Sequence, residues 1–204
     1  HPREVTPRLI DVYARLPQLV NHVHLPVQSG SDRVLAHMKR GYSVLEYKSI
    51  VRRLRKVRPD ISITSDFIVG FPGETDEDFT ATLSIVDAVR YASAYSFKYS
   101  ARPGTPAAQM EGAVAPEVMD DRLQRLQARI AEHSLAFNRA TIGKDTQILI
   151  DRKGRLPGQM IGKSPWLQSI FVETMALAAS MSMGRFKPTT APNADNGSAS
   201  RART

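Results

Sequence analysis

The 204-residue sequence contains no cysteine. Disulfide bonds, thiolate metal sites and iron–sulfur clusters held by cysteine are therefore excluded within this chain. It also lacks an apolar run near the roughly 20 residues that cross a bilayer, and it has no charged-then-apolar leader. We accordingly expect a cytoplasmic monomer with no membrane partner. The sequence opens directly on His1 and Pro2 without an initiator methionine, which predicts the interior of a longer protein.

Acidic residues are fewer than basic ones. The chain has 20 Asp and Glu against 28 Lys and Arg, a formal net charge of +8 and a pI near 10.0. This balance favours a polyanionic partner such as nucleic acid, although a merely basic soluble protein is nearly as common. The apolar content of 42% is sufficient for a hydrophobic core.

Apolar periodicity predicts strands alternating with helices over the first 142 residues. Such alternation implies an α/β fold with a parallel sheet and right-handed crossovers. Three strands are too few for a closed barrel, so part of the sheet is expected to be missing. The predicted strands are residues 22–27, 61–69 and 94–99, and the predicted helices are 6–15, 31–40, 43–57, 75–90 and 116–141.

The pattern changes near Ile142 and Gly143, where we place a domain boundary. Short apolar segments separated by basic turns follow at 147–150, 159–162 and 168–172, and they predict a small β-barrel. The last segment is rich in Ala, Ser, Thr, Asn and Pro, which predicts disorder. The expected domains are therefore residues 1–142, 143–173 and a divergent tail over 174–204.

The most informative stretch is residues 66–75, DFIVGFPGET. It predicts a strand, a tight loop and a helix start, and ligands of α/β folds bind at such carboxyl ends of parallel strands. Its glycines let a ligand approach the backbone, and the helix start offers unpaired N–H groups. Residues 28–31, QSGS, follow an earlier strand in the same way. Their alternative interpretation is a simple turn in which Ser31 caps a helix.

Four segments carry a resemblance to a known family. They are residues 24–31 (HLPVQSGS), 66–75 (DFIVGFPGET), 99–107 (YSARPGTPA) and 154–168 (GRLPGQMIGKSPWLQ). In this order and spacing they resemble the radical S-adenosylmethionine methylthiotransferases, and in particular the MiaB family that acts on tRNA. The resemblance covers about residues 1–173. The tail beyond Glu173 departs from it, as a frameshift, a fusion scar or a divergent end would.

The resemblance implies a fold and a set of partners. The expected fold is the carboxyl-terminal part of a partial TIM-like radical domain, followed by an incomplete RNA-binding TRAM barrel. The family uses S-adenosylmethionine and two 4Fe-4S clusters, whose cysteines lie in segments not present here. Its partners are the tRNA anticodon stem-loop and an electron donor that reduces the cluster. No cluster is ligated by this chain, so we expect it to be inactive alone.

The implied reaction converts N6-dimethylallyladenosine beside the anticodon, adenosine 37, to its 2-methylthio derivative. A 5′-deoxyadenosyl radical abstracts the hydrogen at C2, and a methylated sulfur from the auxiliary cluster is inserted there. Two alternatives stay open. One is a sister methylthiotransferase acting on threonylcarbamoyl-adenosine or a ribosomal-protein aspartate. The other is a non-catalytic RNA-binding remnant.

Site residues follow from the matching positions. No catalytic or metal-binding residue is assigned. Asp66 lies mid-strand and needs a partner, which is either the ligand or an arginine such as Arg102. Trp166 is assigned to the barrel core rather than to base stacking, and His22 and His24 to structural roles. The predicted S-adenosylmethionine contacts are Gln28, Ser29, Gly30, Ser31, Asp66, Gly70, Phe71 and Pro72, and the predicted RNA contacts are Arg102, Arg152, Lys153, Arg155 and Lys163.

Overall fold

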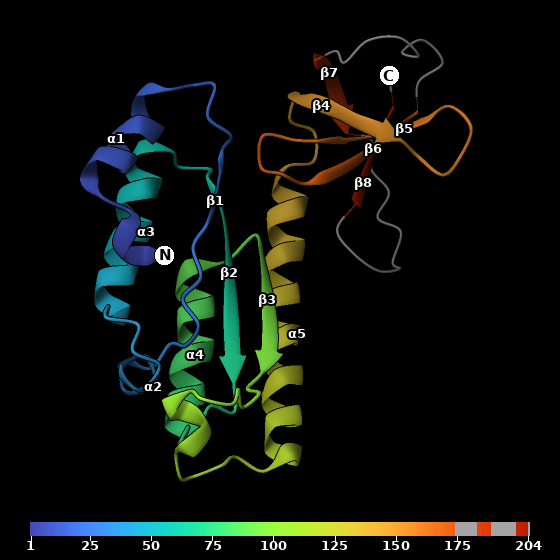
Figure 1. The fold of residues 1–204 in the computed structure, drawn as a ribbon. Coiled ribbons are helices and arrows are strands. Elements are labelled where there is room, and N and C mark those ends of the chain that lie inside the picture. Colours follow the sequence, from blue (N-terminus) through green and yellow to red (C-terminus); the bar gives the residue numbers. More distant parts are fainter. Residues whose placement is uncertain (174–182, 189–198, 204) are drawn as a thin grey trace. The chain divides into compact units, whose positions relative to one another are not determined.

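The computed structural model describes residues 1–173, 183–188 and 199–203 (Figure 1). The chain divides into two compact units. The first comprises residues 1–19 and 23–134, and the second comprises residues 20–22 and 135–204. Each is described by itself below.

The first unit is a mixed α/β structure, as the alternation of apolar patterns predicted. Its three strands lie in the order β1-β2-β3, and β2 and β3 are parallel. Its elements are η1 (Pro2–Glu4), α1 (Pro7–Arg15), β1 (His22–His24), α2 (Asp32–His37), α3 (Val44–Val57), β2 (Ser62–Val69), α4 (Asp76–Val89), β3 (Ser93–Lys98), η2 (Pro106–Gln109) and α5 (Pro116–Ala140).

Strand β1 is shorter than the predicted strand over 22–27. It ends at His24 because Pro26 has no N–H to give to a sheet ladder. The chain nevertheless continues beside β2: the Leu25 amide donates to the Thr64 carbonyl at 2.8 Å. Gln28 then forms a parallel bridge with Phe67. The polar turn after β1 is thus attached to the sheet.

Helices α3 and α4 have well-capped starts. Ser43 and Glu46 form the predicted capping box of α3. Thr75 and Asp78 form a second capping box at the start of α4. Because both boxes satisfy backbone N–H groups that the helices leave unpaired, they fix where each helix begins.

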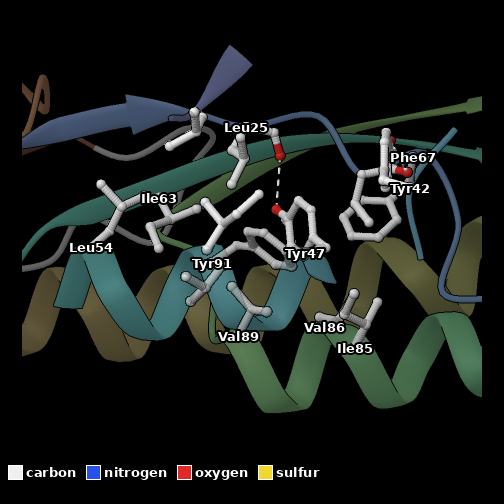
Figure 2. Close-up of a cluster of buried hydrophobic side chains, with 14 of the residues drawn as sticks. Leu25, Tyr42, Tyr47, Leu54, Ile63, Phe67, Ile85, Val86, Val89 and Tyr91 are labelled. Atoms are coloured by element: carbon white, nitrogen blue, oxygen red, sulfur yellow. Dashed lines mark hydrogen bonds between the residues drawn. The ribbon is translucent and has the colours of Figure 1, made fainter. Parts of the chain in front are cut away.

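The core lies between one face of the sheet and the helices α3 and α4 (Figure 2). Strand β2 contributes Ile63 and Phe67 to it. Two tyrosines bring polar atoms into this layer. The buried Tyr91 hydroxyl donates to the Tyr47 hydroxyl at 3.1 Å, and Tyr47 donates to the Leu25 carbonyl at 2.8 Å. Burial raises the pKa of both hydroxyls, so they stay protonated as donors.

The described residues of the second unit form five strands. They pair in the order β4-β5-β6-β8-β7, and β7 pairs with β4 to close the ring. Its buried apolar side chains include Ile148, Ile150, Ile170 and Val172. A small barrel is therefore present, and its identity as a TRAM domain stays a prediction. The strands are β4 (Thr146–Lys153), β5 (Gln159–Lys163), β6 (Ser169–Glu173), β7 (Met183–Pro188) and β8 (Ala199–Arg203).

The predicted disordered tail over 174–204 falls mostly outside the described residues. From that range the structure describes only the backbone of β7 and β8. Strand β8 pairs with β6 in parallel and with β7 in antiparallel orientation.

The Tyr91–Tyr47–Leu25 chain of hydrogen bonds predicts a measurable stability effect. Replacing Tyr47 with Phe leaves the Tyr91 hydroxyl and the Leu25 carbonyl without their partner in a dry core, which should cost about 1–3 kcal/mol of unfolding free energy. Urea unfolding followed by circular dichroism measures this. The exposed Tyr95→Phe serves as the matched control and should change stability by less than about 0.5 kcal/mol. Equal midpoints for the two variants would contradict the assignment.

Candidate functional site

The carboxyl ends of the strands bring three loops to one edge of the sheet (Figure 1). The loops follow β1, β2 and β3, and they contain three of the four segments that carry the family resemblance. This edge is where the sequence places its ligand contacts. Some polar groups at this edge form hydrogen bonds within the fold, and others are accessible to a ligand.

Gln28 occupies an unusual position in the first loop. Its φ is 73°, a left-handed conformation that side chains other than glycine rarely adopt. Its amide donates to the Asp66 carbonyl and its carbonyl accepts from the Ile68 amide, both at 2.9 Å. The residue is only 8% exposed. The parallel bridge to β2 therefore holds the turn in a strained conformation.

The next three residues attach this loop to α4. The Gly30 amide donates to the Thr82 hydroxyl at 3.0 Å, and the Ser29 hydroxyl lies 3.3 Å from that same oxygen. A Cβ on Gly30 would stand 2.3 Å from the Ala81 carbonyl oxygen, so close packing requires glycine. Ser31 caps α2 and donates to Asp78 at 2.6 Å. The polar groups of these residues thus form hydrogen bonds within the fold. This agrees with the alternative interpretation of residues 28–31 as a turn in which Ser31 caps a helix.

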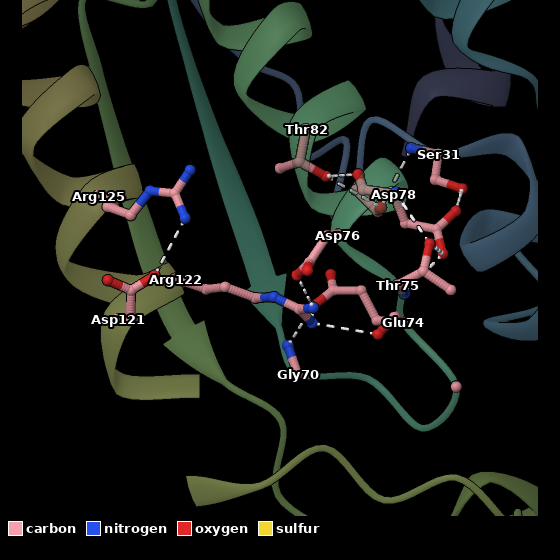
Figure 3. A network of polar contacts seen from close by, with 12 residues as sticks. Ser31, Gly70, Glu74, Thr75, Asp76, Asp78, Thr82, Asp121, Arg122 and Arg125 are labelled. Carbon is pink, nitrogen blue, oxygen red and sulfur yellow. Dashed lines mark hydrogen bonds and ion pairs between the residues drawn. The ribbon is translucent and has the colours of Figure 1, made fainter. Parts of the chain in front are cut away.

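Asp78 gathers donors from three segments (Figure 3). Besides Ser31, it accepts from Arg33 of α2 and from the Thr75 amide at 2.9 Å. Burial alone would raise its pKa, but the hydrogen bonds from Arg33, Ser31 and Thr75 outweigh burial and lower that pKa well below the ordinary value. Asp78 is therefore a carboxylate that ties the loops after β1 and β2 to the start of α4.

Glu74 makes the second anchor (Figure 3). Its Oε2 accepts from the Gly70 amide at 2.7 Å and from Arg122 of α5 at 2.8 Å. The side chains of Glu74 and Arg122 are 0% and 5% exposed, and Arg122 also reaches Asp76 at 2.7 Å. Burial raises the pKa of Glu74, while the Gly70 amide and Arg122 oppose that rise. Met119 of α5 covers Gly70, where a Cβ would lie 2.2 Å from its Cγ.

The second loop buries its apolar residues. Phe71 and Pro72 are both buried, and the Phe71 ring meets the Tyr99 ring edge-on at 5.2 Å. The Tyr99 hydroxyl is buried, and it has no hydrogen-bond partner within the part of the chain that the structure describes. An unpaired buried hydroxyl is costly, so this oxygen is a candidate to bond a ligand.

One face of the sheet remains open. Along β2, buried Phe67 alternates with Asp66 and Ile68, which are only partly buried. The register pairs Asp66 with Tyr95 and Ile68 with Phe97, so these side chains share a face. Tyr95 is 69% exposed and Phe97 is 52% exposed. Their rings stack at 6.4 Å with an interplanar angle of 20°.

A histidine completes this open face. His24 Nε2 lies 3.4 Å from the Asp66 carboxylate, and its Nδ1 lies 3.0 Å from the Thr64 hydroxyl. The Asp66 partner is therefore His24, whereas Arg102 lies in the exposed loop after β3. Aromatic faces stack on nucleobases, and a carboxylate accepts hydrogen bonds from base or ribose donors. The face defined by His24, Asp66, Tyr95 and Phe97 is thus chemically suited to a nucleoside, and we call it the open sheet face.

The predicted RNA contacts of the second unit lie in and around β4 and β5. Arg152, Lys153 and Arg155 are exposed, and Arg152 pairs with the neighbouring Asp151 at 2.9 Å. Lys163 is partly buried and donates to the Ser169 hydroxyl at 2.8 Å. Trp166, assigned to the core, is partly buried.

The turn that carries Arg155 is held by a buried glutamine. Gln159 Oε1 accepts from the Arg155 amide at 3.1 Å, and the Gln159 carbonyl accepts from the Gly154 amide at 2.7 Å. A Cβ on Gly154 would lie 2.4 Å from Gln159 Oε1, so a larger residue there would displace the Gln159 side chain from this turn.

Comparison with known proteins finds a matching superfamily and several curated relatives. The Radical SAM superfamily matches residues 1–86. A protein of Sphingopyxis alaskensis is 56% identical over 178 residues, which cover 87% of this chain and 40% of the relative. One of Novosphingobium aromaticivorans is 55% identical over 170 residues (83% and 38%), and one of Nitrosospira multiformis is 56% identical over 165 residues (80% and 35%). Each is named tRNA-2-methylthio-N(6)-dimethylallyladenosine synthase.

The chain is thus similar to radical S-adenosylmethionine proteins over residues 1–86 and to these synthases over most of its own length. It spans about 40% of the length of the curated relatives it matches. No group of three or more potential metal ligands occurs among the described residues. Among those same residues, no helix is both long and apolar enough to span a membrane.

The radical S-adenosylmethionine family implies two kinds of bound group, and the chain fits only one. Iron–sulfur clusters need cysteine ligands, and none is present. S-adenosylmethionine carries an adenosine with ribose hydroxyls and an aromatic base. The unpaired Tyr99 hydroxyl and the open sheet face, with Asp66, Tyr95 and Phe97, offer groups that such a ligand uses. Of the predicted contacts, Asp66 is therefore open to a ligand, whereas the polar groups of Ser29, Gly30 and Ser31 are engaged with α2 and α4.

Several residues of the candidate site were missed by the sequence-based prediction. Asp78 could have been found as the last residue of a Thr-x-x-Asp capping box. Tyr95 and Phe97 lie in a predicted strand, but only the register shows that they share a face with Asp66. Arg122 carries no distinctive sequence signal, because it is one of several arginines on a long helix.

The buried Glu74–Arg122 pair predicts a large mutational effect. Arg122→Gln leaves an unpaired carboxylate in a buried site, which should cost about 3–5 kcal/mol of unfolding free energy. The matched control is Arg125→Gln on the same helix, because Arg125 forms an exposed pair with Asp121. Its cost should stay below about 1 kcal/mol. Chemical denaturation of both variants measures the difference, and similar costs would show that the anchor is not structural.

The lowered pKa of Asp78 predicts a pH dependence. A carboxyl whose folded pKa lies below its ordinary 3.8 stabilises the protein above that pH, and this contribution is lost as the pH falls towards the folded value. Asp78→Asn should therefore be destabilised relative to the parent chain at pH 7, and the difference should shrink below about pH 4. Thermal melts from pH 7 to pH 3 test this. A difference that stays constant over the series would refute it.

Proposed function

We propose that this chain is part of a tRNA methylthiotransferase that converts N6-dimethylallyladenosine at position 37 to its 2-methylthio derivative. One observation carries the proposal: the chain is 56% identical over 178 residues to a protein named for that product. The chain spans about 40% of that relative, so the activity belongs to the whole enzyme. In that enzyme the reaction class is group transfer, and the proposed place of action is the cytoplasm.

The first unit is proposed to hold the nucleoside ligands. In the proposed enzyme, S-adenosylmethionine supplies the 5′-deoxyadenosyl radical. The residues of this chain bind and orient: Tyr95 and Phe97 offer stacking faces, and Asp66, held by His24, accepts hydrogen bonds. The predicted pocket residues Gln28 to Ser31 and Gly70 to Pro72 contribute to this site by shaping the loops beside it.

The second unit is proposed to be an RNA-binding TRAM domain. Its exposed Arg152, Lys153 and Arg155 offer charges to the phosphates of the tRNA anticodon stem-loop. Arg102, exposed in the first unit, is proposed to make a further phosphate contact. An external electron donor is the remaining partner of the proposed reaction.

A specific observation supports a second candidate for the isolated chain. Because it contains no cysteine, it cannot ligate either 4Fe-4S cluster of the family through thiolates. The second candidate is therefore a non-catalytic RNA-binding module. It predicts salt-sensitive tRNA binding without formation of a methylthio product.

Mass spectrometry of tRNA nucleosides tests the proposed reaction. Deleting the gene in the source organism should remove 2-methylthio-N6-dimethylallyladenosine and accumulate N6-dimethylallyladenosine. Complementation with the full-length gene carrying the Tyr95→Leu, Phe97→Leu double substitution should restore the product at a rate reduced at least about tenfold, because each lost stacking contact is worth about 1–3 kcal/mol.

The matched control for the double variant is Leu16→Ala. Leu16 is about as exposed as Phe97 but follows α1, away from the open sheet face, so its loss should leave the product level normal. Unchanged methylthiolation in the deletion strain would refute the proposed function. Full complementation by the double variant would refute only the role of the open sheet face.

A further inference from the structure

A groove lies between α3 and the last turn of α4, outside the candidate site. Its volume is about 490 Å³, within the range of ligand-binding clefts. It is formed on the helices that pack against the buried face of the sheet, whereas the open sheet face presents the opposite side. Its lining residues are Leu45, Lys48, Val51, Arg52, Arg55, Lys56, Ala88 and Val89.

Half of the lining residues are cationic. Lys48, Arg52 and Lys56 are spaced four residues apart, so they form a row along α3 with about 6 Å between successive members. None of the three forms an ion pair with another described residue. Arg55 instead donates to the Val89 carbonyl at the end of α4, and burial lowers its pKa. The row therefore presents three uncompensated positive charges.

The nearest acidic side chains are engaged elsewhere. Glu46 accepts from the Ser43 amide at 2.7 Å in the capping box. Asp87 accepts from His133 at 2.9 Å and pairs with Arg129 of α5. No carboxylate lines the groove within the described part of the chain. Its charge is thus available to an anionic partner.

The other half of the groove lining is apolar. It consists of Leu45, Val51, Ala88 and Val89. A suitable partner therefore carries regularly repeated anions together with less polar surfaces between them. A nucleic-acid strand has both, because its phosphates alternate with riboses and bases. The net charge of +8 on the whole chain adds long-range attraction for such a polymer.

We propose that the groove between α3 and α4 binds the phosphate backbone of RNA through Lys48, Arg52 and Lys56. The inference rests on the proposed function in one respect, since tRNA is the RNA expected to occupy it. The groove lies away from the reacting nucleoside, so it holds the body of the RNA and carries no base specificity.

Salt-dependent binding of the 204-residue chain to fluorescently labelled tRNA tests the proposal. The groove variant is Lys48→Gln, Arg52→Gln, Lys56→Gln. If each cation contacts one phosphate, the slope of log Kobs against log salt should become shallower by about 2–3, because each contact contributes about 0.7–0.9. The affinity in about 0.1 M salt should fall at least about tenfold.

The matched control removes the same charge outside the groove. Arg8→Gln, Lys39→Gln, Arg53→Gln changes three exposed cations of the first unit that do not line it. Its slope should change by less than about 1 if general attraction alone is affected. Circular dichroism melts confirm that both variants remain folded to the same extent as the parent.

Three outcomes overturn the proposal: no tRNA binding by the parent chain, equal losses in the two triple variants, or an unchanged slope in the groove variant. An unchanged slope would instead indicate that the groove binds an acidic protein surface.

A competition experiment uses inorganic phosphate and ATP. Displacement of tRNA by either at millimolar concentration overturns the RNA assignment in favour of a simple anion site. Binding is scored without the methylthio product, so failure of the reaction test leaves this inference standing.

Discussion

The junction between β2 and α4 depends on two carboxylates that hold the loops of the first unit together. Glu74 binds the Gly70 amide and Arg122 of α5, and Asp78 binds Ser31 and Arg33 from the preceding loop and α2. A buried carboxylate is tolerated only when donors surround it, so each anchor requires its partners to be in place together. Distant segments are thereby fixed around one loop.

This constraint changes how the family motifs are understood. The residues from Ser29 to Ser31 satisfy each other and α4, so their identity is accounted for by loop shape. The aromatic and acidic groups of the open sheet face take no part in these loop hydrogen bonds or in the core. They therefore remain available to a ligand. A rigid set of loops beside an uncommitted face is the arrangement expected of a binding site, since preorganised groups lose less entropy when a ligand arrives.

The sequence predicted those features that depend on local patterns. The capping box of Ser43 and Glu46 and the order of helices and strands were predicted because both are set by neighbouring residues. The pairing of Asp66 with His24, and not with Arg102, depends on which strands lie side by side and in what register. The partner of Glu74 could not be predicted for the same reason, since Arg122 lies 48 residues away in the sequence.

The distribution of unpaired charge separates two tasks within the first unit. On the open sheet face, Asp66 lies 3.4 Å from His24, and the exposed groups beside it are neutral aromatics suited to stacking. Between α3 and α4, Lys48, Arg52 and Lys56 form no ion pair with another described residue, and they share the groove with apolar side chains. A neutral stacking surface can discriminate between bases, whereas a row of cations attracts any phosphate backbone equally. Recognition of a nucleoside and retention of its polymer are therefore separable properties of this unit, and substitutions in one region should leave the other unchanged.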